Sequence, residues 1–128
     1  MDRLKILLVD DEADFLETMG SIIKGWGYDL ITAVSGKKAI DAVMAQKADI
    51  VILDYMMPEM DGVITLKEIR KINKEIPVIM FTAHPDIKIM KGAEKLGVSA
   101  FIPKLSAYSD VQSGLKAALD MAGKKLRK

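Results

Sequence analysis

Short runs of apolar residues alternate along the chain with longer stretches whose apolar residues recur every three or four positions. The short runs predict strands, and the longer stretches have the spacing of one face of a helix. Five strands are predicted, at residues 4–9, 28–34, 50–54, 78–82 and 99–102. Five helices are predicted from the apolar positions within residues 15–23, 39–44, 63–72, 89–96 and 111–122. Ser35 is a candidate cap for the second helix, and Gly97 closes the fourth.

The strict alternation of strands and helices with short links predicts a single α/β domain. Parallel neighbouring strands require right-handed crossovers, which place helices on both faces of a doubly wound sheet. We expect a five-stranded parallel sheet in the order 2-1-3-4-5, in which the first and third strands are neighbours. The domain is expected to cover residues 1–123, and the basic segment 124–128 is expected to be a frayed tail.

Acidic residues follow the first and third strands. Four apolar residues at 50–53 predict a strand buried on both faces, and it ends on Asp54. Pro58 and Gly62 mark the loop that follows, where glycine accepts a positive φ. Asp10 and Asp11 come directly after the first strand. Because ligands of open α/β sheets bind at the carboxyl edge, we expect Asp10, Asp11 and Asp54 to lie together there.

The chemistry of such a cluster follows from its charge. Three neighbouring carboxylates repel one another, so one must bind a proton or a cation must lie among them. An all-oxygen donor set favours Mg²⁺, which typically binds one or two carboxylates together with phosphate oxygens. A carboxylate at a strand end can also act as a nucleophile and form an aspartyl-phosphate. Thr82 ends the fourth strand and Lys104 follows the fifth, and both side chains can bind a phosphoryl group.

Each candidate residue has a simpler explanation when it is taken alone. An acid pair after a strand commonly caps the next helix. Thr82 can be an ordinary strand end, and Lys104 can be a solvated surface lysine. The acids, the threonine and the lysine nevertheless fall at the carboxyl ends of different strands, and this coincidence favours a functional site.

Composition excludes several other classes of protein. The chain has 19 basic and 18 acidic residues, and this net charge of +1 gives no electrostatic reason to expect direct contact with nucleic acid. It has no cysteine, and therefore no disulfide, thiol nucleophile or thiolate ligand. No apolar run approaches the roughly 18 residues of a membrane span, and the first residues do not resemble a signal peptide. We therefore expect a cytoplasmic protein without membrane contact.

Four short motifs contain the candidate site residues. They are LVDDE at 8–12, LDYMMPEMDG at 53–62, PVIMFTA at 77–83 and FIPK at 101–104. Together they resemble the receiver domain of two-component response regulators over essentially the whole chain, and the second motif is the most specific. The resemblance implies a flavodoxin-like fold. The strand order given above rests partly on it, because a chemotaxis protein of this family is a standard example of that order.

The resemblance implies a role for each acidic residue. Asp54 accepts a phosphoryl group from the phosphohistidine of a histidine kinase or phosphotransfer protein. Asp10, Asp11 and Asp54 hold Mg²⁺, with the backbone carbonyl of Met56 as a further ligand. The domain is then a signalling module rather than a turnover enzyme, and it catalyses only its own phosphorylation and slow dephosphorylation.

The resemblance also implies how the signal is transmitted. Lys104 pairs with the phosphoryl group, and Thr82 and Phe101 move together on phosphorylation. This remodels the face formed by the fourth helix, fifth strand and fifth helix, where a downstream protein effector binds; the chain is a monomer or a phosphorylation-dependent dimer. Met56 and His84 occupy positions that tune phosphoryl lifetime. Taken alone, Phe101 can be a half-buried core aromatic and His84 a solvent-facing loop residue.

The segment Pro103-Lys104-Leu105 departs from the family pattern, in which a proline follows the lysine in a cis bond. A non-proline cis bond costs about 3–4 kcal/mol, so the Lys104–Leu105 bond is expected to be trans or strained. The alternative function is therefore a pseudo-receiver, a folded scaffold that does not switch by phosphorylation.

Two other classes agree less well with the sequence. A dehalogenase-type phosphatase needs a second acid two residues after the nucleophile, where this chain has Met56. A flavodoxin-like cofactor carrier needs a first loop that cradles phosphate, and the acids at 10–12 would repel that group.

Overall fold

The protein is described by a computed structural model that covers residues 3–83, 86–103 and 108–126. Strands and helices alternate strictly, as the hydrophobic pattern predicted. The elements are β1 (Lys5–Val9), α1 (Ala13–Gly25), β2 (Asp29–Ala33), α2 (Gly36–Met44), β3 (Ile50–Asp54), α3 (Gly62–Ile72), β4 (Val78–Thr82), α4 (Ile87–Lys95), β5 (Ala100–Pro103) and α5 (Tyr108–Leu126). In these segments no helix is long and apolar enough to cross a membrane.

The strands form one parallel sheet in the order β2-β1-β3-β4-β5, which confirms the predicted topology. β1 and β3 are neighbours, with Val9 paired to Leu53. On the other side of β3, Asp54 is paired with Phe81 of β4. The residues that follow β1, β3 and β4 therefore meet at one edge of the sheet.

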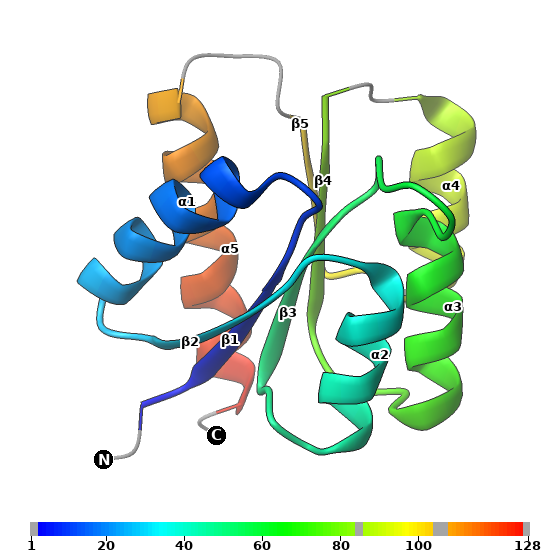
Figure 1. The fold of residues 1–128 in the computed structure, drawn as a ribbon, viewed down its shortest axis with the longest axis horizontal. Helices are drawn as coiled ribbons and strands as arrows, with labels where there is room; N and C mark the ends of the chain where they lie inside the picture. Colours follow the sequence, from blue (N-terminus) through cyan, green and yellow to red (C-terminus); the bar gives the residue numbers. More distant parts are fainter. Residues whose placement is uncertain (1–2, 84–85, 104–107, 127–128) are drawn as a thin grey trace.

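Helices cover both faces of the sheet (Figure 1). α1 and α5 lie on one face, and α2, α3 and α4 lie on the other. Alternate residues of each inner strand point to opposite layers. Leu8 and Ile52 pack in the first layer, whereas Leu7 and Leu53 pack in the second, and all four are fully buried. This two-sided burial explains why the strands are nearly continuous apolar runs.

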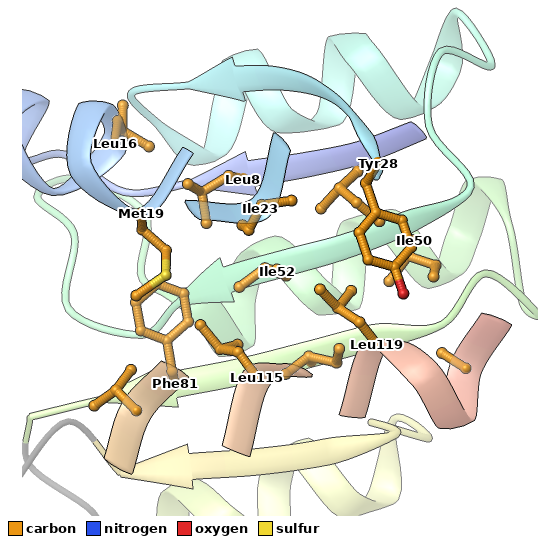
Figure 2. Close-up of a cluster of buried hydrophobic side chains, with 14 residues drawn as sticks. Leu8, Leu16, Met19, Ile23, Tyr28, Ile50, Ile52, Phe81, Leu115 and Leu119 are labelled. Carbon is orange, nitrogen blue, oxygen red and sulfur yellow. The ribbon is translucent and has the colours of Figure 1, made fainter. Parts of the chain in front are cut away.

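Figure 2 shows the layer beneath α1 and α5, where Phe81 lies close to Met19 and Leu115. Phe81 also stacks on Phe15 of α1, with 5.3 Å between the ring centroids. The same cluster continues along α5 to Leu119. The aromatic stack joins the start of α1 to β4 directly beside the edge of the sheet.

The last helix extends beyond the apolar positions that predict it. α5 continues through Lys124 and Lys125 to Leu126, and fraying of the basic segment 124–128 remains a prediction. The preceding turn is anchored, because Ala122 is 4% exposed and a Cβ on Gly123 would lie 3.3 Å from Leu4. A helix packed up to that point extends readily by another residue or two at its C-terminus.

Gly62 begins α3, and its role also differs from the prediction. The positive φ in this loop occurs at Glu59, with φ 68°, and not at Gly62. Gly62 is required because a Cβ there would lie 2.6 Å from the carbonyl oxygen of Asp54 and 2.7 Å from the Cα of Tyr55. Its N–H donates to the Tyr55 carbonyl at 2.8 Å. The loop after Asp54 is thus folded tightly against the first turn of α3.

Replacing Leu119 by Ala should lower the free energy of unfolding by about 2–5 kcal/mol, because the side chain is fully buried between α5 and the sheet. Met121 lies on the same helix but is 67% exposed, so Met121→Ala should change stability by less than about 0.5 kcal/mol. Urea denaturation measures both values. Equal effects would contradict the packing of α5 described above.

Replacing Gly62 by Ala should cost about 1–3 kcal/mol, because the new methyl group would displace the backbone of the Asp54 loop. Gly92 in α4 is the matched control, since a Cβ there meets only Val63 at an ordinary 3.6 Å. Gly92→Ala should leave stability unchanged or raise it by up to about 1 kcal/mol. A Gly62→Ala protein as stable as the wild type in urea would disprove the close approach.

Candidate functional site

Asp54 is held at the carboxyl edge of the sheet as a nearly buried carboxylate. It is the last residue of β3 and is 2% exposed. Its Oδ1 accepts the Met56 N–H at 3.3 Å, and the next residue, Tyr55, donates its N–H to the Phe81 carbonyl at 3.0 Å. Backbone bonds therefore fix the chain on both sides of the carboxylate, and its position is set by the sheet rather than by the loop.

Asp10 lies at the corresponding point after β1 and is fully buried. Its N–H donates to the Ala33 carbonyl at 3.1 Å, and its Oδ1 accepts the Glu12 N–H at 2.9 Å. This side-chain bond folds the backbone so that one carboxylate oxygen each from Asp10, Asp11 and Glu12 lies within 4.8 Å of the others. Such a concentration of negative charge is suited to a divalent cation.

The structure brings Asp10 and Asp11 together, and Asp54 ends the strand adjacent to the one that precedes them. A shared metal site with Asp54 remains a prediction. The third member of the cluster is Glu12, which lies in the acidic motif but is not among the predicted site residues. The signal was present, because Glu12 completes an unbroken run of three acids directly after a strand.

The simpler explanation for Asp10 and Asp11 was that they cap α1. The N-cap position belongs to Glu12, and the Glu12 side chain accepts no capping hydrogen bond. Its carboxylate points into the acidic cluster instead, and Asp11 and Glu12 are both exposed at the surface. Capping of α1 therefore does not account for the three acids.

An open cleft of about 440 Å³ lies beside Asp11. The β3–α3 loop supplies its remaining lining residues, which are Tyr55, Met56, Met57, Pro58 and Asp61. Asp61 also caps α3, because its Oδ1 accepts the Ile64 N–H at 2.9 Å. Burial, and then the negative charges of Asp61 and Asp86, raise the pKa of the Tyr55 phenol above its ordinary value. Asp11 and Asp61 thus place two acidic side chains in the lining of this cleft.

Met56 combines a constrained backbone with an exposed side chain. Its N–H is bonded to Asp54, while its side chain is 50% exposed at the rim of the cleft. Met56 thus lies directly beside Asp54, the predicted nucleophile. Two roles are predicted for it: its backbone carbonyl as a metal ligand, and its side chain as a group that tunes phosphoryl lifetime.

Thr82 ends β4 and is fully buried, paired with Pro103 of β5. It does not cap α4, because Asp86 does so by accepting the Lys88 N–H at 2.7 Å. Phe101 lies in β5, half-buried, against the cluster of side chains beneath α2, α3 and α4. The two remaining candidates, His84 and Lys104, lie outside the described residues.

The chain matches a known protein family along most of its length. The family model of the response regulator receiver domain matches residues 6–116. The transcriptional regulatory protein ZraR of Escherichia coli K12 is 36% identical over 118 residues, which is 92% of this chain and 27% of that protein. The probable transcriptional regulator ycf27 of Porphyridium aerugineum is 35% identical, over 93% of this chain and 49% of that protein. The chain thus spans between a quarter and a half of the length of these relatives.

Solved structures have the same fold. A CheY-like receiver domain protein from Methanospirillum hungatei superposes with a TM-score of 0.86 at 22% identity, and the match covers 97% of this chain and 99% of that one. A receiver domain protein from Clostridium thermocellum gives a TM-score of 0.80 at 29% identity, over 98% and 99% of the two chains. Sequence, fold and the acidic edge of the sheet agree, and the chain belongs to the response regulator receiver domain family.

Proposed function

We propose that the chain is a phosphoacceptor signalling domain in which Asp54 receives a phosphoryl group from a histidine kinase or a phosphotransfer protein. One observation supports this above all others. Asp54 is a nearly buried carboxylate at the end of β3, adjacent to the strand that leads into the acidic cluster of Asp10, Asp11 and Glu12. A carboxylate in that position can attack an incoming phosphorus atom, while its acidic neighbours can hold the countercharge.

In the proposed transfer, one carboxylate oxygen of Asp54 attacks the phosphorus of a phosphohistidine. The new P–O bond forms as the P–N bond breaks, and the departing imidazole nitrogen takes up a proton. The Met56 N–H, already bonded to the Asp54 carboxylate, helps to orient it. Lys104 would pair with the transferred group. The chain acts as a substrate and self-catalyst and not as a turnover enzyme.

The donor set agrees with Mg²⁺. Carboxylate oxygens of Asp10, Asp11 and Glu12 lie within 4.8 Å of one another, and hard oxygen ligands of this kind are those that Mg²⁺ prefers. Asp10, Asp11, Asp54 and the Met56 carbonyl are the proposed ligands, with Glu12 beside them. A bound Mg²⁺ supplies charge neutralisation for the phosphoryl group. The protein residues fix the nucleophile and exclude bulk water from it.

The proposed output is a changed surface. Thr82 is buried at the end of β4 and Phe101 is half-buried in the neighbouring β5, so a shift of the threonine toward a phosphoryl group can be passed to the aromatic ring. The face of α4, β5 and α5 would then bind a downstream protein effector, or a second copy of the chain. Met56 and His84 would tune the lifetime of the phosphorylated state. We place this activity in the cytoplasm, with no direct contact to nucleic acid.

Incubation with acetyl phosphate and Mg²⁺ should add one phosphoryl group to the wild-type chain, as measured by intact-mass spectrometry. Asp54→Asn should show no addition, because an amide is not a nucleophile of this kind. Omitting Mg²⁺ should abolish the reaction. A folded wild-type protein that gains no mass, and that also fails to respond to beryllofluoride, would favour the scaffold alternative instead.

Neutralising the acidic cluster should raise the Mg²⁺ concentration needed for half-maximal phosphorylation. We expect about tenfold or more for Asp11→Asn and a smaller increase for Glu12→Gln, because each removes one negative charge from the cation site. Glu17→Gln is the control, since it removes an exposed acid from α1, the helix that follows the cluster, without touching the cluster itself. If Glu12→Gln and Glu17→Gln behave alike, Glu12 has no part in the site.

A further inference from the structure

Arg70 of α3 donates hydrogen bonds to four backbone carbonyls and is the most highly connected side chain among the described hydrogen bonds. Its Nε bonds the Leu96 carbonyl at 2.6 Å, and its Nη2 bonds the Gly97 carbonyl at 3.1 Å. Its Nη1 bonds the carbonyls of Ile76 at 2.7 Å and Asn73 at 3.3 Å. The guanidinium therefore joins the end of α4 to the α3–β4 loop.

Two of these acceptors, the carbonyls of Asn73 and Leu96, belong to the C-terminal groups that a helix leaves without partners. Asn73 is the C-cap residue of α3, and Leu96 is the C-cap residue of α4. One positive charge thus lies at the negative ends of two helix dipoles. Only arginine has the planar, forked set of donors that can bond several carbonyls at once, because a lysine ammonium is a single compact charge.

α4 is attached unevenly along its length. Its single buried residue, Ala93, lies in its second half, near the end that Arg70 holds. At the other end Ile87 is 70% exposed and Met90 is 42% exposed. After α4 the chain returns to the amino edge of the sheet, where the Ser99 N–H donates to Val78 at the start of β4 (Figure 1). The firmly held end of α4 is therefore the end distant from Asp54.

We propose that Arg70 is a positioning residue that fixes the C-terminal end of α4, so that a change at the Asp54 site displaces the N-terminal half of α4 about this end. The inference rests on the proposed phosphoacceptor function, because that function supplies the change at Asp54. According to this proposal, residues 87–91 of α4 move when the site changes. Residues 96–98 stay in place and act as the pivot.

Amide hydrogen exchange measured by NMR on the full chain tests this, with beryllofluoride and Mg²⁺ as the phosphoryl mimic. In the wild type, exchange within residues 87–91 should change on addition of the mimic. The amides of Leu96, Gly97 and Val98, which bond back to α4, should change by less than about twofold. In Arg70→Gln these three amides should exchange about tenfold faster without the mimic, and its effect should then extend along all of α4.

Two variants serve as comparisons. Lys71→Gln removes an equal charge from the same turn of α3, but Lys71 is exposed and pairs only with Glu68 in the described contacts, so it should behave as wild type. Arg70→Lys keeps the charge and loses the fork, so it should resemble Arg70→Gln. Circular dichroism and urea denaturation establish that each variant is folded. The wild-type experiment tests the pivot by itself, even if a variant fails to fold.

The possible failures are distinguishable. In the wild type, the mimic could change amide exchange around Asp54 and change exchange in residues 96–98 as strongly as in residues 87–91. In that case the pivot is wrong and the phosphoacceptor function stands. If Arg70→Gln leaves the exchange of Gly97 and Val98 unchanged, the anchoring role of Arg70 is wrong. If the mimic changes the exchange rate of no amide at all, the phosphoacceptor function is wrong, and the pivot that rests on it is wrong as well.

Discussion

The pairing of β3 between β1 and β4 is the constraint on which the rest of the structure depends. Every residue of β3 is buried, and its backbone is hydrogen-bonded to a parallel strand on each side. Moving Asp54 along the edge would require breaking these bonds or exposing apolar side chains on both faces. The tight contact of Gly62 with the Asp54 carbonyl fixes the following loop in the same way. The carboxylate is therefore held rigidly before any ligand binds.

Burial of acidic groups at this edge has an electrostatic cost that the local structure offsets. Asp10 is fully buried and Asp54 nearly so, yet in the described part of the chain no buried side-chain oxygen or nitrogen lacks a hydrogen-bond partner. The Glu12 and Met56 amides supply part of this compensation. A cation among the carboxylates would offset more of it, which links the proposed metal requirement to the fold itself.

Rigidity at the acidic edge contrasts with the loose attachment of one surface helix. β1, β3 and β4 form a core with fully buried side chains, whereas α4 buries a single residue and is held at its distant end by the Arg70 guanidinium. A protein that must convert a local change of charge into a different surface needs both properties. The fixed sheet keeps the site in place, and the weakly packed helix is where a small change of free energy can alter structure.

The sequence by itself determined the number and type of elements, the parallel sheet and the edge at which the acids lie. It could do so because buried parallel strands are continuous apolar runs, and because the residue after each run must lie at the carboxyl edge. Tertiary structure alone decided that Glu12 joins Asp10 and Asp11, since a side-chain bond of Asp10 folds that turn. It also decided that Gly62 is needed for close approach rather than for its φ, and that Arg70 binds four carbonyls from two segments. These features depend on distances between parts of the chain that no local pattern of residues encodes.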